Sequence, residues 1–148
     1  MIDIDVRTLS DKVGQEFAAS EWVEISQQKI NQFADATSDH QWIHIDQARA
    51  ANESPFKTTI AHGFLTLSLV SALLRSAINP TGLRMAINYG LNRVRFVSPL
   101  PSGSRVRGRF ALAKVEEAGG AIQATWTATI EREWNMARAW LRRELSRQ

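Results

Sequence analysis

The sequence predicts an α+β domain in which an antiparallel sheet wraps around one central, buried helix. Residues 60–78 carry apolar side chains on nearly every face at helical spacing, and a helix that is apolar all round is a buried one. Beyond residue 82 the apolar period changes from 3.6 to 2, which indicates antiparallel strands with one solvated face. The other face of such a sheet must be covered, and we expect the helix to cover it.

Two shorter elements are expected ahead of the central helix. A weakly alternating strand over 21–25 leads to a helix over 27–36, with Ser26 as its N-cap and three residues facing the core: Ile30, Phe33 and Ala34. The next stretch, 39–59, is polar and irregular, with one short helix around 47–51. A loop of this length inside a compact domain usually serves function.

Three strands are expected after the central helix, which ends at the breaker sequence NPTG at 79–82. They cover 92–97, 105–115 and 121–130. The last of them is the clearest, because its apolar residues alternate with glutamine and threonine. Gly119-Gly120 lies between the last two strands and predicts a hairpin turn.

Length and composition limit the class of protein. The chain of 148 residues suits one domain over 1–148, and 44% hydrophobic with 22% charged residues is close to the globular average. No apolar run approaches the roughly 18 residues that span a bilayer, and the first residues lack the basic and apolar regions of a signal peptide. Cysteine is absent, which suits the cytoplasm. We therefore expect a soluble cytoplasmic protein with no membrane partner.

The net charge is +3, and much of the basic excess comes late in the chain, at Arg132, Arg138, Arg142, Arg143 and Arg147. Such charge can attract nucleic acid or a phosphate-bearing small molecule. Acidic residues are interspersed among these arginines, and no aromatic-plus-basic motif accompanies them. A solvated basic face is therefore the favoured interpretation, and no nucleic-acid partner is expected.

The nine residues SDHQWIHID at 38–46 hold two of the three histidines of the chain, together with two aspartates. On a continuous α-helix Asp39 and His44 would lie about 140° apart, so they can cooperate only if the chain leaves the helix between them. A carboxylate beside an imidazole can hold one water and move a proton at neutral pH, as general acid-base catalysis requires. A turn-capping Asp39 and a half-buried, packing His44 are an equally open alternative.

The neighbouring residues have weaker functional signals. His40 is expected to be exposed, and His62 to serve a turn or capping role before the buried helix. Together with His44 and an aspartate they could bind zinc, but the spacing matches no zinc signature, so no metal is expected. Gly63 follows, and the free backbone N–H at the start of a helix can bind a developing oxyanion. A tight turn or close helix packing is the alternative for this glycine.

Recognisable motifs lie in the segments FADATSDHQWIHID, TTIAHGFLTLSLVSALL and YGLNRVRFVSPLPSGSRVR. They resemble the MaoC-like hydratase/dehydratase family of hot-dog-fold proteins, closest to its nodulation-protein-N-like branch, and the similarity runs over about 13–130. The family motifs are an Asp-x-Asn-Pro-x-His core, a His-Gly step into the central helix, and a Phe-x-x-Pro-x-x-x-Gly element that is matched by Phe96, Pro99 and Gly103. Gln41 and Trp42 replace the usual Asn-Pro, which we interpret as a feature of the branch.

The resemblance implies an (R)-specific 2-enoyl-CoA hydratase, which is equally a (3R)-hydroxyacyl thioester dehydratase. It makes Asp39 and His44 the catalytic pair, the Gly63 N–H the donor to the thioester carbonyl, and Ser71 a hydroxyl near the site. It implies no cofactor, and as partners an acyl-CoA or acyl-carrier-protein thioester and a second copy of the chain in a homodimer. A last strand around 139–145 is also implied.

Two rival functions are open on the same fold. One is a non-catalytic acyl-thioester binding module, and the other is an acyl-CoA thioesterase that uses a lone carboxylate beside a helix-start amide. The presence of Asp39, His44 and Gly63 argues against the first. Release of a free thiol would distinguish the second from hydration.

Overall fold

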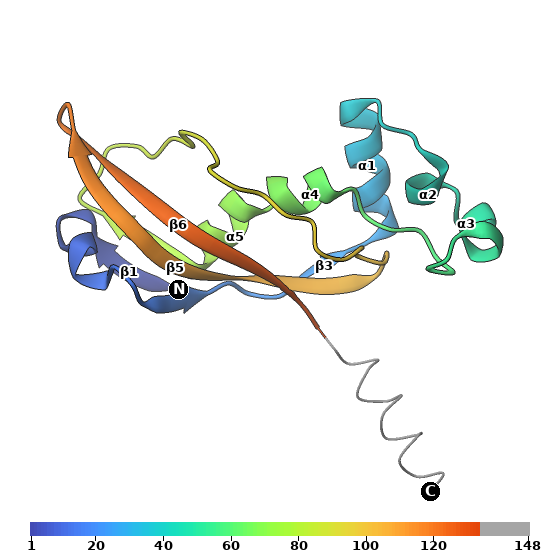
Figure 1. Ribbon diagram of the computed structural model, residues 1–148, viewed down its shortest axis with the longest axis horizontal. Coiled ribbons are helices and arrows are strands. Elements are labelled where there is room, and N and C mark those ends of the chain that lie inside the picture. The colour runs from blue at the N-terminus through green and yellow to red at the C-terminus, as the bar shows by residue number, and fades with distance from the viewer. Residues whose placement is uncertain (134–148) are drawn as a thin grey trace, which may run out of the picture.

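The computed structural model describes residues 1–133. Its elements are, in chain order, β1 (Ile2–Asp5), the 3-10 helix η1 (Val6–Lys12), β2 (Glu16–Ala19), β3 (Val23–Ile25), α1 (Gln27–Thr37), α2 (Trp42–Ile45), α3 (Gln47–Glu53), α4 (Gly63–Ser68), α5 (Val70–Ala77), β4 (Ile78–Thr81), β5 (Ser104–Ala118) and β6 (Ala121–Arg132). β5 and β6 form a long curved hairpin, α4 and α5 lie along one side of it, and α1–α3 gather at one end (Figure 1). No described helix combines the length and the apolar character that a membrane span requires.

The sheet is built around β5, which forms a hairpin with β6 and also pairs with β2 and β3. The two strands pair antiparallel from Val106 opposite Arg132 to Ala118 opposite Ala121. β3 and β2 pair antiparallel with β5 at two successive places along its other edge. Gly119 and Gly120 form the turn with φ of +59° and +78°, a left-handed conformation that glycine adopts without strain. The predicted hairpin and its two strands are therefore confirmed.

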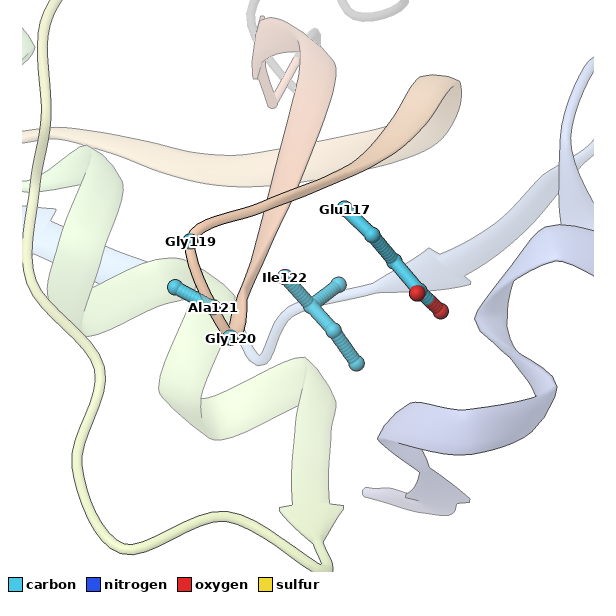
Figure 2. Close-up of a pocket in the computed structure, with 5 residues that line it drawn as sticks. All are labelled: Glu117, Gly119, Gly120, Ala121 and Ile122. Carbon is cyan, nitrogen blue, oxygen red and sulfur yellow. The ribbon is translucent and has the colours of Figure 1, made fainter.

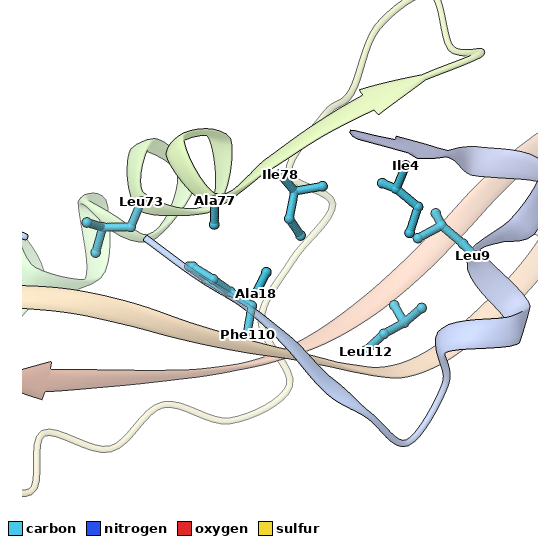
Figure 3. Packing of buried hydrophobic residues seen from close by; sticks show 8 residues of the cluster. All are labelled: Ile4, Leu9, Ala18, Leu73, Ala77, Ile78, Phe110 and Leu112. Atoms are coloured by element: carbon cyan, nitrogen blue, oxygen red, sulfur yellow. The ribbon is translucent and has the colours of Figure 1, made fainter. Parts of the chain in front are cut away.

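A core cluster holds the helix against the sheet (Figure 3). Its buried members come from β1, η1, β2, α5, β4 and β5, and they are Ile4, Leu9, Ala18, Leu73, Ala77, Ile78, Phe110 and Leu112. Phe110 is fully buried, and its ring fills the space beside Gly108, where an added Cβ would lie 2.6 Å from it. The sheet thus curves over a central helix, which confirms the predicted α+β architecture.

The first long helix, α1, follows the prediction. The Ser26 hydroxyl caps it by accepting a hydrogen bond from the Lys29 backbone N–H at 3.3 Å. Ile30 and Ala34 are fully buried, and Phe33 packs against a second core cluster. That cluster lies beneath α1 and α4 and consists of Ile25, Ile30, Ala61, Leu65, Leu100 and Val106. It fixes the start of the central helix relative to α1.

The central helix is shorter and more exposed than predicted. It begins at Gly63 instead of residue 60, ends at Ala77, and is divided at Leu69 into α4 and α5. One face is buried through Leu65, Leu73 and Ala77, whereas Phe64 is 68% exposed. The prediction of burial on all sides is wrong for the single chain, because the sheet covers one side of the helix only.

The predicted strand over 92–97 is also wrong. Within the described residues, 82–99 form no strand and are exposed throughout. A strand needs a neighbour to satisfy its backbone groups, and no described strand pairs with this stretch. Phe96 instead packs its ring edge-on against Phe64, with the ring centroids 5.6 Å apart. The implied strand over 139–145 lies outside the described residues.

Five elements of the structure were not predicted, namely β1, η1, β2, α2 and β4. β1 pairs in parallel with β4. The segment 79–82, which was expected to be a turn that ends the central helix, therefore lies largely within β4. β2 joins the main sheet near the N-terminus. α2 precedes the predicted short helix, which is α3 and extends to Glu53. The irregular excursion expected over 39–59 therefore contains two short helices, and the candidate catalytic residues lie at the start of it.

Candidate active site

Asp39 and His44 are brought together because the chain leaves α1 just before Asp39 and turns into a new helix before it reaches His44. Ser38 ends α1 with a left-handed φ of 60°, and His44 then lies within the one-turn helix α2. A carboxylate oxygen of Asp39 and one ring nitrogen each of His44 and His62 all lie within 4.8 Å of one another. We call these three residues the Asp39 cluster.

His44 is held in place by its ring. The side chain is buried, and Nδ1 lies 2.7 Å from the Ile60 carbonyl oxygen. Because a carbonyl only accepts, Nδ1 carries the hydrogen, and Nε2 is the acceptor of the neutral ring. Burial lowers the pKa of His44, with a smaller contribution from His62, while the hydrogen bond to Ile60 and the Asp39 carboxylate act in the opposite direction. A neutral His44 is therefore the form present at neutral pH, and it can take a proton.

The backbone of His44 is held as well. The Gln27 side-chain Nε2 donates to the His44 carbonyl at 2.7 Å. The hydroxyl of Thr59, which is buried, donates to Oε1 of the same Gln27 side chain. These bonds connect α1, α2 and the segment before α4, so they fix the helical turn that carries His44 to the rest of the fold. Sequence reasoning missed this role of Gln27, for which a lone glutamine 17 residues away offers no signal.

Asp39 lies on the solvent side of the Asp39 cluster. Its side chain is 55% exposed, so a ligand can reach the carboxylate. Its backbone carbonyl accepts a hydrogen bond from His62 Nε2 at 2.9 Å, and Oδ2 lies 3.9 Å from the same nitrogen. The carboxylate is thus both open to solvent and close to two buried imidazoles.

The role predicted for His62 is wrong in its detail. His62 occupies the N-cap position of α4, but its side chain makes no capping hydrogen bond. The ring is instead buried, with 3% of the side chain exposed, and stacks on His44 at a centroid distance of 3.7 Å and an interplanar angle of 27°. Its Nδ1 is buried and has no hydrogen-bond partner among the described residues. The His-Gly step before a helix was the available signal for this residue.

The zinc combination of three histidines is not assembled. His40 is exposed, as predicted, and its Nε2 lies 2.9 Å from a carboxylate oxygen of Asp35, away from the Asp39 cluster. The Asp39 cluster itself has residue types that bind metals. Its two imidazoles are stacked, however, and each already uses one ring nitrogen in a hydrogen bond to a backbone carbonyl.

Gly63 is the first residue of α4, where backbone N–H groups lack intrahelical partners. An added Cβ at Gly63 would lie 2.9 Å from the ring of Phe96, so close packing alone is one reason for glycine here. Ser71 lies on α5, eight residues or about 12 Å further along a helix, and its hydroxyl accepts a hydrogen bond from Asn88 at 2.9 Å. Gly63 directly follows His62 in the chain, whereas no contact within the described residues joins Ser71 to the Asp39 cluster.

A hollow lies at the tip of the β5–β6 hairpin (Figure 2), and its lining consists of Glu117, Gly119, Gly120, Ala121 and Ile122. The hairpin tip and α2 are at opposite ends of the molecule (Figure 1). The lining offers a single titratable side chain, Glu117, whose cross-strand neighbour is the apolar Ile122. One carboxylate without an acid-base partner gives this hollow no evident chemistry.

Comparisons with known proteins cover nearly all of the described chain. The sequence profile of the MaoC like domain matches residues 8–134. A relative from Mycobacterium tuberculosis (strain CDC 1551 / Oshkosh), named 3-hydroxyacyl-thioester dehydratase Z, is 51% identical over 86% of this chain and 85% of its own length. Nodulation protein N of Rhizobium leguminosarum bv. viciae is 48% identical over 90% of this chain and 84% of its own length. Among solved structures, the (R)-hydratase from A. caviae involved in PHA biosynthesis has a TM-score of 0.56 and 26% identity, over 81% of this chain and 84% of that chain.

Proposed function

The chain belongs to the MaoC-like hydratase/dehydratase family, and on that premise we propose that it catalyses the reversible, (R)-specific hydration of a trans-2-enoyl thioester to a (3R)-hydroxyacyl thioester. The observation that carries the proposal is the convergence of the Asp39 carboxylate with the neutral imidazole of His44. Hydration of an enoyl thioester needs a water held and deprotonated near C3 and a proton delivered to C2. An adjacent carboxylate and imidazole supply these groups.

In the proposed reaction the Asp39 carboxylate orients the water, and His44 Nε2 accepts its proton as the oxygen bonds to C3. The hydrogen bond from Nδ1 to the Ile60 carbonyl favours the imidazolium that forms. The electron pair of the C2–C3 double bond moves toward C2 and the thioester carbonyl. The His44 imidazolium then donates the proton that it took from the water to C2. The sum is addition of one water with no cofactor, and the reverse sequence is dehydration.

The developing charge on the thioester oxygen requires a hydrogen-bond donor. We assign this role to the backbone N–H of Gly63, because it begins α4 directly after His62. Ser71 lies further along the helical rod and would contact a more distant part of the substrate. An acyl-CoA and an acyl-carrier-protein thioester both present the same enoyl group to these residues.

We also propose that two copies of the chain form a homodimer. The exposed residues 83–97 carry large apolar side chains that are more than half exposed in the single chain, namely Met85, Ile87, Tyr89, Leu91, Phe96 and Val97. Large exposed apolar patches commonly mark protein interfaces. A second copy would cover them beside α4 and so close the site near Gly63. The cytoplasm is the compartment that we expect for the enzyme.

A hydration assay tests the proposed function. Purified full-length protein is mixed with crotonyl-CoA, and the ultraviolet absorbance of the conjugated enoyl thioester is followed, with the product identified by chiral chromatography. We expect loss of absorbance and formation of the (3R)-hydroxyacyl product. Release of free thiol without hydration would indicate a thioesterase, and binding without either reaction would indicate a non-catalytic module; both results would contradict the proposal.

A further inference from the structure

His62 is the member of the Asp39 cluster that the proposed reaction does not use. It is 3% exposed, and it contacts both catalytic residues, one through a hydrogen bond and the other through ring stacking. We infer that His62 is a positioning residue, which holds the backbone of Asp39 and the ring plane of His44 in the arrangement needed to share one water. This inference rests on the proposed function and adds a residue to it.

The hydrogen bond to Asp39 determines the tautomer of His62. Its acceptor is a backbone carbonyl, so Nε2 must carry the hydrogen. Nδ1 is buried and has no partner among the described residues, so a second hydrogen there would be a buried donor without an acceptor. The ring is therefore arranged to hold Asp39 rather than to pass protons to the substrate.

His62 also provides the attachment of Asp39 to the protein interior. Both polar contacts of Asp39 within the described chain are made with His62, one through the carbonyl and one through Oδ2. Asp39 otherwise follows the left-handed turn at Ser38 and has a side chain that is 55% exposed. The contacts with His62 therefore restrict where the carboxylate lies relative to the His44 ring.

The ring of His62 is itself fixed between two partners. His44 stacks on it at 3.7 Å, and Phe33 of α1 packs against it with ring centroids 5.0 Å apart. The Phe33 side chain packs against the second core cluster beneath α1 and α4. The packed core thus holds the His62 imidazole, which in turn contacts both members of the proposed catalytic pair.

Two variants separate the hydrogen bond from the ring. His62→Phe keeps a flat ring for stacking but has no donor, whereas His62→Gln keeps a side-chain N–H but has no ring. His40→Phe, at an exposed position outside the Asp39 cluster, is the matched control. We expect His62→Phe to lower kcat for crotonyl-CoA about tenfold, the size of one lost hydrogen bond, with KM changed less than about twofold.

We expect His62→Gln to recover part of the lost kcat and the control to match the unmodified enzyme. An unchanged kcat in His62→Phe would overturn the inference. Equal losses in both His62 variants, accompanied by a lower melting temperature, would also overturn it, because packing alone would then explain them. If the unmodified enzyme hydrates crotonyl-CoA and His62→Phe does so equally well, the proposed function stands and only the positioning role of His62 is refuted.

A measurement without substrate tests the same geometry. Two-bond ¹H–¹⁵N spectra of the unmodified protein at neutral pH report which nitrogen of each imidazole carries the hydrogen. We expect the hydrogen on Nε2 of His62 and on Nδ1 of His44. A hydrogen on Nδ1 alone of His62 would overturn the inference, whether or not the protein hydrates an enoyl thioester, because that ring could not donate to Asp39.

Discussion

Gln27 and Thr59 hold the backbone of His44, and replacing either side chain should reduce the free energy of unfolding. Gln27 Nε2 donates to the His44 carbonyl at 2.7 Å, and the Thr59 hydroxyl donates to Gln27 Oε1. Thr59 is 1% exposed, so its hydroxyl cannot turn to water when Gln27 is lost. The perturbation that tests this connection is a double-mutant cycle of Gln27→Leu and Thr59→Val.

The magnitude follows from the number of buried groups that lose a partner. Thr59→Val leaves only Gln27 Oε1 without its donor, which should reduce the free energy of unfolding by about 1 kcal/mol. Gln27→Leu leaves both the Thr59 hydroxyl and the His44 carbonyl unsatisfied, which should reduce it by about 2 to 4 kcal/mol. In the double variant the Thr59 hydroxyl no longer exists, so the loss should be about 1 kcal/mol smaller than simple addition predicts.

Urea denaturation followed by circular dichroism measures the four free energies of unfolding. Gln28→Leu, the same change at the adjacent exposed position of α1, is the control and should change stability by less than about 0.5 kcal/mol. Because the His44 carbonyl loses its donor, kcat should fall in Gln27→Leu but not in the control. Strict additivity of the two single changes would refute the connection between Gln27 and Thr59.

Three further predictions concern the core, the pH dependence and the helix. Gly108→Ala should lower the free energy of unfolding by about 1 to 3 kcal/mol, since its Cβ would meet the buried Phe110 ring at 2.6 Å; an unchanged denaturation midpoint would contradict this packing. Because burial lowers the pKa of His44, the unfolded chain binds more protons than the folded chain as the pH falls. The stability that this residue contributes is therefore complete above its ordinary pKa of 6.5 and is lost as the pH falls through the lowered value. The melting temperature should vary less with pH in His44→Gln than in the unmodified protein, and identical pH curves would contradict the burial effect. Ser71→Ala should raise KM for crotonyl-CoA more than it lowers kcat, whereas a kcat reduced as much as in Asp39→Asn would place this hydroxyl at the reacting atoms.

The predicted elements that the structure confirms depend on local chemistry. Ser26 caps α1 through a contact three residues away, and Gly119-Gly120 makes a tight turn that requires left-handed φ values. The long alternation that follows the turn identifies β6 without reference to any distant residue. Each of these signals lies within a few residues of the structure that it predicts.

The predictions that failed depend on distant partners. An apolar alternation at 92–97 gives a strand only if another strand is available to pair with it, and the spacing of residues says nothing about that partner. The parallel pairing of β1 with β4 joins segments that are 76 residues apart in the chain, as the hydrogen bond from Asn79 to Asp3 illustrates. The prediction that the central helix is buried on all sides failed because the composition of a helix does not reveal how many layers of structure cover it.

The candidate site was predicted only in part, because some of its residues are close in sequence and others are distant. Asp39 and His44 are close in sequence, and the need for a break between them could be derived from helical geometry. Gln27 and His62 reach the pair across 17 and 23 residues, so their roles required the fold. Residue types therefore indicated the candidate chemistry, while the positions of Asp39 and His44 relative to each other depended on tertiary contacts.

The most direct test of the central claim is the steady-state rate of crotonyl-CoA hydration by Asp39→Asn and by His44→Asn. Each variant should lose about two to four orders of magnitude in kcat while it keeps the melting behaviour of a folded protein, because one change removes the carboxylate that orients the water and the other removes the imidazole that accepts its proton. A folded variant of either residue that hydrates crotonyl-CoA at a near-normal rate would contradict the assignment of Asp39 and His44 as the catalytic pair.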